Sequence, residues 1–262
     1  MDIRLDHKNA VVCGSTQGIG KAIAMELAGL GANVFLLARN EASLKKTLNE
    51  LPKESDQKHG YAIADFNHPE EVNQAIGQLL EDAGDIHILV NNSGGPPPGL
   101  ASEATSEDFE LAFRRHLVNN QQLVQAFVPG MKKAAYGRII NVISTSVKAP
   151  IPNLGVSNTI RGAVASWAKT ISNELGGFGI TVNNILPGLT HTARLESLIE
   201  QKAQNSGVSI EEMAKKMKSE IPAGRFADPE ETAALAGFLA GPSAAYINGT
   251  SIRVDGGKTP SI

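Results

Sequence analysis

The feature that most constrains the fold of this chain is a repeated alternation of short apolar runs with longer amphipathic segments. The apolar runs have the length and the content of Val, Ile and Leu that are typical of buried strands. The segments between them place apolar residues at helical spacing, as at Ile19, Ile23 and Leu27. The predicted strands cover residues 9–14, 33–39, 60–65, 86–92, 137–144, 180–188 and 250–257. Strands that alternate with helical crossovers predict a doubly wound α/β fold with a seven-stranded parallel sheet.

Size, charge and cysteine content narrow the class of protein. The 262 residues are 42% hydrophobic and show no break in composition, so we expect a single domain over residues 1–262. The formal charge is −3, and acidic and basic residues are mixed along the chain. The sequence therefore shows no basic stripe of the kind that binds nucleic acids, and a small-molecule substrate is favoured. The charged N-terminus and the lack of a long apolar run predict a cytoplasmic protein with no membrane segment. Cys13 lies inside an apolar run and is expected to be a buried structural thiol.

One segment interrupts the alternation of strands and helices. Residues 190–226 carry two amphipathic patterns between the last two predicted strands, and this is too long for an ordinary connection. Such an excursion is typical of a binding element, so we expect a helical flap over a cleft. The charged run "EEMAKKMK" within it is expected to be the solvated face of that flap.

The turn after the first predicted strand contains glycines in the pattern G-x-x-x-G-x-G, and a predicted helix follows it. Glycines permit a tight turn and let the backbone approach a pyrophosphate, whose charge is stabilised by the N-terminus of the helix. The alternative is an ordinary strand–helix turn, because glycine spacing alone is weak evidence. In this context the motif predicts a dinucleotide site. Its expected residues are Gly14, Ser15, Thr16, Gln17, Gly18, Ile19 and Gly20.

The residue at the end of the second predicted strand bears on the choice of nicotinamide cofactor. A carboxylate there would bind a ribose 2′-hydroxyl, whereas a guanidinium suits a 2′-phosphate. The chain has Arg39 at this position, which predicts NADP(H). The alternative is that Arg39 only covers the surface end of the strand.

Four further motifs complete a resemblance to a known family. They are "NNSGG" at 91–95, Ser144 after the fifth strand, "LPGLTHT" at 186–192 and the closing segment at 228–257. Over essentially all of its length the chain resembles the short-chain dehydrogenase/reductases, which are Rossmann-fold enzymes, and within them the 3-oxoacyl-acyl-carrier-protein reductase branch. The resemblance implies further contacts to the cofactor. They are Asp65 and Phe66 beside the adenine, Asn92, Ser93 and Gly94 near the adenosine ribose, and Pro187, Gly188 and Thr192 at the nicotinamide amide.

The same resemblance implies a catalytic set that this chain keeps only in part. The family uses a Ser to polarise the carbonyl, a Tyr to transfer the proton, a Lys to hold the ribose and lower the Tyr pKa, and an Asn to anchor a relay water. Ser144 stands at the Ser position, whereas Ser157, Arg161 and His116 stand at those of Tyr, Lys and Asn. A serine hydroxyl, unlike a phenol with a pKa of about 10, cannot readily transfer a proton near neutral pH. We therefore expect a divergent subgroup with an altered route of proton delivery.

Two of these replacements admit both a chemical and a structural role. Arg161 lies one helical turn after Ser157 and could bind ribose hydroxyls or an anionic substrate group, or it could form a structural salt bridge. His116 has an ordinary pKa suited to proton transfer. It shares a predicted helix face with Phe109 and Phe113, so a buried core histidine is the preferred interpretation and a proton donor the alternative.

Three other predictions concern the surroundings of the site. The loop at 95–99 contains three prolines and is expected to form a rigid wall of the substrate pocket. The predicted helices at 109–131 and 156–175 are apolar on more than one face, which, with the family resemblance, predicts a homotetramer. Asn183 and Asn184 are expected to satisfy buried backbone groups.

The sequence thus supports two functions. The first is an NADP(H)-dependent oxidoreductase for a small-molecule carbonyl or alcohol, with catalysis by Ser144 and Arg161 and a proton from water or His116. The alternative is a catalytically weak or inactive NADP(H)-binding protein that acts as a sensor or as a subunit partner. Both predict cofactor binding, so only turnover separates them.

Overall fold

In the computed structural model, which describes residues 1–54 and 56–261, all seven predicted strands form one parallel sheet. The strand order is β3-β2-β1-β4-β5-β6-β7, so the chain reverses its direction of travel across the sheet between β1 and β4. Ligands bind at such a switch point in doubly wound sheets, outside the carboxyl ends of the strands. The strands are β1 (Asn9–Cys13), β2 (Asn33–Ala38), β3 (Gly60–Ile63), β4 (Ile88–Asn91), β5 (Gly137–Val142), β6 (Ile180–Pro187) and β7 (Ser251–Val254).

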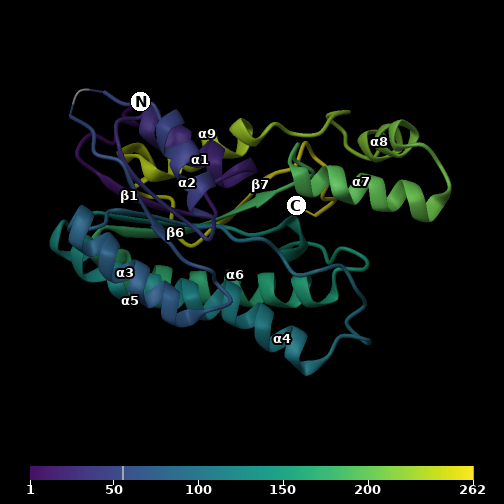
Figure 1. The fold of residues 1–262 in the computed structure, drawn as a ribbon, viewed down its shortest axis with the longest axis horizontal. Helices are drawn as coiled ribbons and strands as arrows, with labels where there is room; N and C mark the ends of the chain where they lie inside the picture. Colours follow the sequence, from purple (N-terminus) through teal and green to yellow (C-terminus); the bar gives the residue numbers. More distant parts are fainter. Residues whose placement is uncertain (55, 262) are drawn as a thin grey trace.

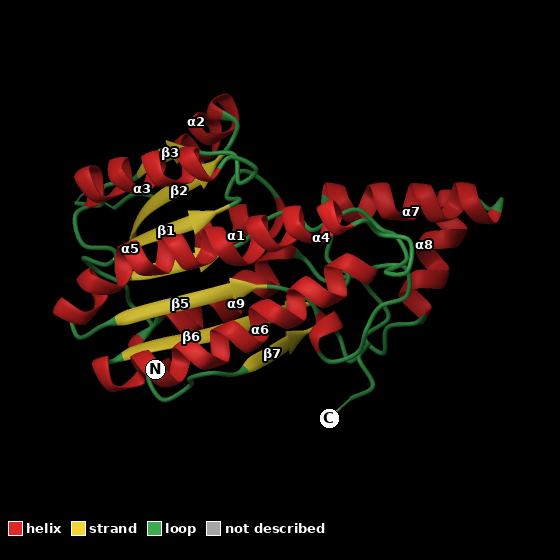
Figure 2. Cartoon of the chain, turned by 90° about the horizontal axis from the view of Figure 1, so that it is seen from below, coloured by secondary structure: helices red, strands yellow, loops and turns green. Residues whose placement is uncertain are grey.

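Helices cover both faces of the sheet, as Figures 1 and 2 show. One face is packed by α1 (Gly18–Gly29), α2 (Glu41–Glu50) and α9 (Pro229–Ala240). The other is packed by α3 (Pro69–Ala83), α5 (Asn119–Lys133) and α6 (Gly155–Leu175). Strands β1, β4 and β5 are almost fully buried between these layers, which explains the mostly apolar sequences of β1 and β4. Within the described ranges no helix has the length and apolar character needed to cross a membrane.

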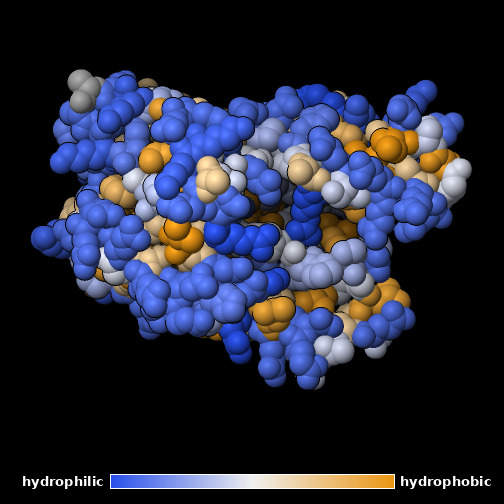
Figure 3. Space-filling model, viewed as in Figure 1, coloured by the Kyte–Doolittle hydropathy of each residue, from blue (hydrophilic) through white to orange (hydrophobic). Residues whose placement is uncertain are grey.

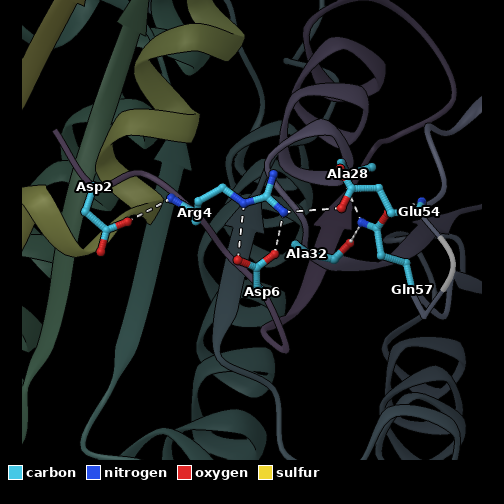
Figure 4. A network of polar contacts seen from close by, with 7 residues as sticks. All are labelled: Asp2, Arg4, Asp6, Ala28, Ala32, Glu54 and Gln57. Atoms are coloured by element: carbon cyan, nitrogen blue, oxygen red, sulfur yellow. Dashed lines mark hydrogen bonds and ion pairs between the residues drawn. The ribbon is translucent and has the colours of Figure 1, made fainter.

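Polar contacts link the N-terminal segment to Glu54, beyond the end of α2, and Gln57 to the region after α1 (Figure 4). The Arg4 guanidinium donates to the Asp6 carboxylate at 2.6 and 3.2 Å and to Glu54 at 3.3 Å. Beside it, the buried Gln57 amide donates to the carbonyls of Ala28 and Ala32, each at 2.8 Å, at the end of α1. Gln57 thereby joins the carbonyl of Ala28, near the end of α1, to that of Ala32, just before β2.

The predicted flap is confirmed as two helices, α7 (Ala193–Ser206) and α8 (Ile210–Ser219). Local signals set their bounds, because Thr192 caps the start of α7 and Gly207 ends it with φ +65°. The two helices pack on each other through a small core of their own. At the base of the flap, the backbones of His191 and Ala227 are joined by a 2.8 Å hydrogen bond. Figure 1 shows α7 and α8 projecting beyond the carboxyl ends of the strands.

The helix predicted over residues 109–131 is interrupted. It consists of α4 (Ser106–Phe113), a π-helical turn η1 (Arg114–Val118) and α5. A π turn holds an extra residue, so it shifts the register of the side chains that follow and cannot be recognised from apolar spacing. His116 lies inside this turn and is 1% exposed.

A row of buried amides crosses the centre of the sheet. The Asn91 amide donates to Asn141, Asn141 donates to Asn184, both at 2.9 Å, and Asn184 donates to Ser251 at 3.1 Å. These residues are paired in register on β4, β5, β6 and β7. The prediction that Asn183 satisfies backbone groups is confirmed by its bonds to Ile247 and Thr250. Asn184 instead bonds to side chains, and the row fixes the alignment of the strands that carry the site.

We predict that Asn141→Ala lowers the free energy of unfolding by about 2–6 kcal/mol, because the Asn91 NH₂ donor and the Asn184 carbonyl oxygen lose their buried partner at about 1–3 kcal/mol each. The exposed control Asn205→Ala on α7 should change it by less than about 0.5 kcal/mol. Urea unfolding followed by circular dichroism measures both. Equal losses in the two variants would contradict a structural role for the amide row.

Candidate active site

The carboxyl ends of β1, β4, β5 and β6 bring the predicted site residues to one edge of the sheet. The turn after β1 leaves no room for a side chain at Gly14, Gly18 or Gly20. A Cβ on Gly20 would lie 2.1 Å from the Gly14 carbonyl oxygen, and one on Gly14 would lie 2.7 Å from the Asn92 carbonyl oxygen. Gly14 and Gly18 also have positive φ angles of 59° and 52°. The prediction that these glycines hold a tight strand–helix turn is therefore confirmed.

The loop after β4 and the loop after β6 meet this glycine turn from two sides. The Asn92 amide donates to the carbonyls of Cys13 and Gly14 at 3.2 and 3.3 Å. A Cβ on Gly18 would lie 2.9 Å from Cγ2 of Thr192, at the start of the flap. Gly188 packs equally closely on Asp255, whose Cα would lie 2.7 Å from a Cβ there.

Cys13 is buried, and burial raises the pKa of its thiol to about 12, so the prediction of an inert structural thiol is confirmed.

The glycine turn fits the phosphates of a dinucleotide. The Ser15 hydroxyl is buried within the turn and has no hydrogen-bond partner among the described residues. The turn leads directly into α1, which has no acidic residue in its first turn. A buried hydroxyl without a partner and a helix N-terminus free of carboxylates together suit a bound anion. The rest of the turn, Thr16, Gln17 and Ile19, lies on the same connection between β1 and α1.

Arg39 stands at the end of β2, beside the residues expected to hold the adenine. Its side chain is 75% exposed and its guanidinium lies 3.8 Å from the Asp65 carboxylate. Asp65 in turn accepts from the Asn67 backbone at 2.9 Å, and the Phe66 carbonyl accepts from Asn119 at 2.8 Å. A loose pair at 3.8 Å leaves most donors of Arg39 free for a phosphate.

Arg161 is the polar centre of the site. It is 7% exposed and donates to the carbonyl of Val142, at the end of β5, at 3.1 Å and to that of Ser93, after β4, at 3.3 Å. No carboxylate forms an ion pair with it within the described ranges. The alternative of a structural salt bridge is thus wrong, although Arg161 does join two loops. Burial, reinforced by the charge of Arg194, lowers the pKa of Arg161 to about 10, so it stays charged at neutral pH.

His116 lies on the other side of Ser93. Its Nδ1 is 2.7 Å from the Ser93 hydroxyl, and its Nε2 is buried without a partner among the described residues. Burial and then the charges of Arg161, Arg115 and Arg194 lower the pKa of His116 to about 2. The imidazole is therefore neutral at physiological pH. This supports the interpretation of a buried polar residue over that of an acid that donates a proton.

Ser144 and Ser157 contribute hydroxyls to the same region. The Ser144 hydroxyl accepts a 3.1 Å bond from the Ser146 backbone and thereby begins a short turn after β5. Ser157 lies in the first part of α6, one turn before Arg161, and is 6% exposed. Its hydroxyl bonds to no other residue in the described part of the chain. Each hydroxyl therefore keeps a hydrogen that it can donate to a ligand.

The proline-containing loop forms a fixed wall beside these residues. Its far end is held by α6, because Gly99 donates to the Asn153 carbonyl and accepts from the Gly155 backbone, both at 2.9 Å. Its near end is held by the flap, where Arg194 donates to the Pro96 carbonyl at 3.4 Å. The face in Figure 3 is hollowed between the lobe of α7 and α8 and the region of α4, with hydrophilic side chains beside the hollow.

Sequence reasoning missed Arg194, which the structure brings into this wall. Its guanidinium lies so close to Gly95 that a Cβ there would be 2.8 Å from Nη1. It has no carboxylate partner within residues 1–54 and 56–261. The signal was available, because Arg194 follows Thr192 of the "LPGLTHT" motif by two residues.

Comparisons with known proteins identify the class. Residues 14–259 match a family model described as enoyl-(acyl carrier protein) reductase. The chain is 30% identical to the NADPH-dependent reductase BacG of Bacillus subtilis, over 98% of this chain and all of that one. It is 32% identical to the 3-oxoacyl-[acyl-carrier-protein] reductase FabG of Vibrio cholerae, over 97% and 98%. The chain therefore belongs to the short-chain dehydrogenase/reductase family.

Solved structures agree with this assignment. The structure of L-sorbose reductase from Gluconobacter frateurii, described with NADPH and L-sorbose, is 29% identical, with a TM-score of 0.94 and full coverage of both chains. An actinorhodin polyketide ketoreductase with NADPH is 30% identical, with a TM-score of 0.90, over 97% of this chain and 98% of that one. The predicted fold class is thus confirmed, and these relatives use the cofactor that Arg39 predicts.

We predict that stability falls in acid because His116 is buried as the neutral imidazole. The unfolded chain binds a proton at His116 below about pH 6.5, whereas the folded chain does not until about pH 2. The free energy of unfolding should therefore fall by up to about 1.4 kcal/mol per pH unit from this residue as pH drops from 6.5 to 4.5. His116→Asn should reduce that slope.

Urea unfolding at pH 7, 5.5 and 4.5 measures the slope for both proteins. The exposed control His68→Asn should keep the slope of the unaltered protein, because His116 is still present in it. An identical slope in the His116 variant would show that the imidazole is not held neutral by the fold.

Proposed function

We propose that this protein is an NADP(H)-dependent oxidoreductase that interconverts a small-molecule carbonyl and its alcohol, with an atypical catalytic site. The observation that carries the proposal is the joint position of a dinucleotide turn, two serine hydroxyls that can each donate a hydrogen bond, and the buried Arg161 at one edge of the sheet. NADPH, when bound, supplies the hydride to the carbonyl carbon. The cofactor residues are those predicted from the sequence, Gly14 to Gly20, Arg39, Asp65, Phe66, Asn92 to Gly94, Pro187, Gly188 and Thr192.

This chain's own residues then orient the substrate and stabilise charge. Ser144 donates a hydrogen bond to the carbonyl oxygen, and Ser157 stands where a second donor can reach it. The permanent charge of Arg161 favours the negative charge that develops on that oxygen in a site shielded from water. Arg161 cannot supply the proton near pH 7, and neither can the neutral His116. Water therefore delivers the proton to the oxygen.

The divergent subgroup is part of the proposal. Ser157 and Arg161 stand where the family resemblance expects a Tyr and a Lys. The contacts of Arg161 support a replacement of the family's Lys that still holds the loops of the site together. The guanidinium donates to two backbone carbonyls, those of Val142 and Ser93. The relatives that reduce carbonyl compounds, such as L-sorbose reductase and the polyketide ketoreductase, favour an enzyme over the alternative of a sensor or subunit partner.

We also infer a homotetramer in the cytoplasm, as the family resemblance and composition predict. Leu111 and Phe113 on α4 are 41% and 43% exposed, which supports burial of this helix against another subunit. Both the assembly and the compartment stay predictions.

We predict that Arg39→Ala weakens NADPH binding about tenfold or more, because a charge-assisted contact to the 2′-phosphate is lost. NADH binding should change little. The control Lys45→Ala removes a nearby exposed charge on α2 and should alter neither affinity. Titration of nicotinamide fluorescence measures all three proteins. An equal loss for NADH and NADPH, or tighter NADH binding by the unaltered protein, would contradict the assignment of Arg39.

We predict that the double variant Ser157→Tyr with Arg161→Lys reduces neutral ketones faster by about 10²–10⁴, because a phenol restores general acid catalysis. NADPH oxidation with simple ketones and 3-oxoacyl thioesters measures the gain. Adding Ser144→Ala should remove most of it, since the carbonyl loses its orienting donor. The thermal unfolding midpoint of each variant shows whether the loss of an Arg161 hydrogen bond has destabilised the protein. A folded double variant that binds NADPH and shows no gain would contradict the proposed roles.

A further inference from the structure

The catalytic edge of the sheet holds positive charges that no carboxylate balances. Arg161 is buried and Arg194 reaches the same region from the flap, and neither forms an ion pair within the described ranges. Some cations elsewhere in the molecule are paired with carboxylates, as Arg225 is with Glu231 at 2.6 and 2.7 Å. Two like charges that face one cleft repel each other unless an anion binds between or beside them.

Arg194 is the free member of this pair. Nη1 and Nη2 of Arg161 both donate to backbone carbonyls, and the side chain is almost fully buried. In the described part of the chain, Arg194 makes one long hydrogen bond, 3.4 Å to the Pro96 carbonyl, and it lies at the exposed start of α7. A guanidinium has five donors in a rigid fork, so several remain for a ligand. Arg194 is therefore the side chain that can receive an anion without disturbing the sheet.

The surroundings place Arg194 at the substrate end of the cleft. It contacts Gly95 and Pro96, in the wall that continues to α6 and Ser157. Its charge is close enough to lower the pKa of both His116 and Arg161. The neighbouring Nε2 of His116 is buried and without a partner, so the region offers a further polar group to a ligand.

We propose that Arg194 is a specificity-determining residue that binds an anionic group, a carboxylate or a phosphate, on the carbonyl substrate, with Arg161 adding its charge from below. This proposal rests on the proposed function and names its substrate class. The same anion chemistry could come from the pyrophosphate of the cofactor. The test must therefore be made with the cofactor already bound.

The first measurement is binding, which does not depend on turnover. The NADP⁺-saturated protein is titrated calorimetrically with oxamate and with its uncharged relative oxamide. We expect oxamate to bind at least tenfold more tightly than oxamide, because an ionised partner strengthens each hydrogen bond. Arg194→Gln should abolish this preference and Arg194→Lys should restore part of it. The control Lys202→Gln, which removes a charge elsewhere on α7, should retain it.

The second measurement is NADPH oxidation with a 2-oxo acid and its methyl ester. In Arg194→Gln, kcat/KM for the acid should fall about 10- to 100-fold, as expected for one charge-assisted contact, while that for the ester and the affinity for NADPH stay unchanged. Equal losses for acid and ester, no preference for oxamate, or a parallel loss of NADPH affinity would overturn the proposal. Arginine-dependent oxamate binding without turnover would support the anion site and reject the proposed function. Turnover without any preference for anions would support the proposed function and reject the anion site.

Discussion

The catalytic edge of this molecule depends on one buried charge, the guanidinium of Arg161. Burying an ionised group is costly unless its donors are satisfied. Here backbone carbonyls of Val142 and Ser93 accept from it, so the charge itself joins the ends of β4 and β5. Ser93 extends the connection to His116 through its hydroxyl. Removing the charge would loosen two loops, and removing either loop would leave the charge unsatisfied.

This arrangement decides which groups can act in catalysis. Burial, reinforced by the charge of Arg161, holds His116 in its neutral form. The same charge stabilises negative charge on a substrate oxygen. The charge of Arg194 adds to the effect of burial on the Arg161 pKa, so the second guanidinium lies near the first. Arg194 has no carboxylate partner within the described ranges and can therefore receive a ligand. The site therefore offers positive charge and hydroxyl donors but no acid poised near neutral pH. A reaction that needs electrostatic stabilisation with a proton from solvent suits it better than one that needs a strong acid.

The sequence predicted the sheet, the dinucleotide turn and the flap because each depends on local patterns. Apolar runs, glycine spacing and the caps at Thr192 and Gly207 act within a few residues. The interior of the site was less predictable, because it depends on contacts between distant strands. The spacing from Phe109 to Phe127 could not reveal the π turn around His116. The sequence also could not show that Arg161 bonds to carbonyls rather than to a carboxylate, or that Asn141 joins a row of amides. The motif before Arg194 marked its position in the sequence, but only the structure shows that its guanidinium contacts Gly95 and Pro96.

The central claim is that this site transfers a hydride without a tyrosine acid. The most direct test follows the fate of deuterium from NADPH labelled at the nicotinamide C4, with a panel of 2-oxo acids and ketones and mass spectrometry of the products. The account predicts one deuterium on the new carbinol carbon. NADPH that binds but never passes its label to any product would contradict the account and favour a nucleotide-binding protein without catalysis.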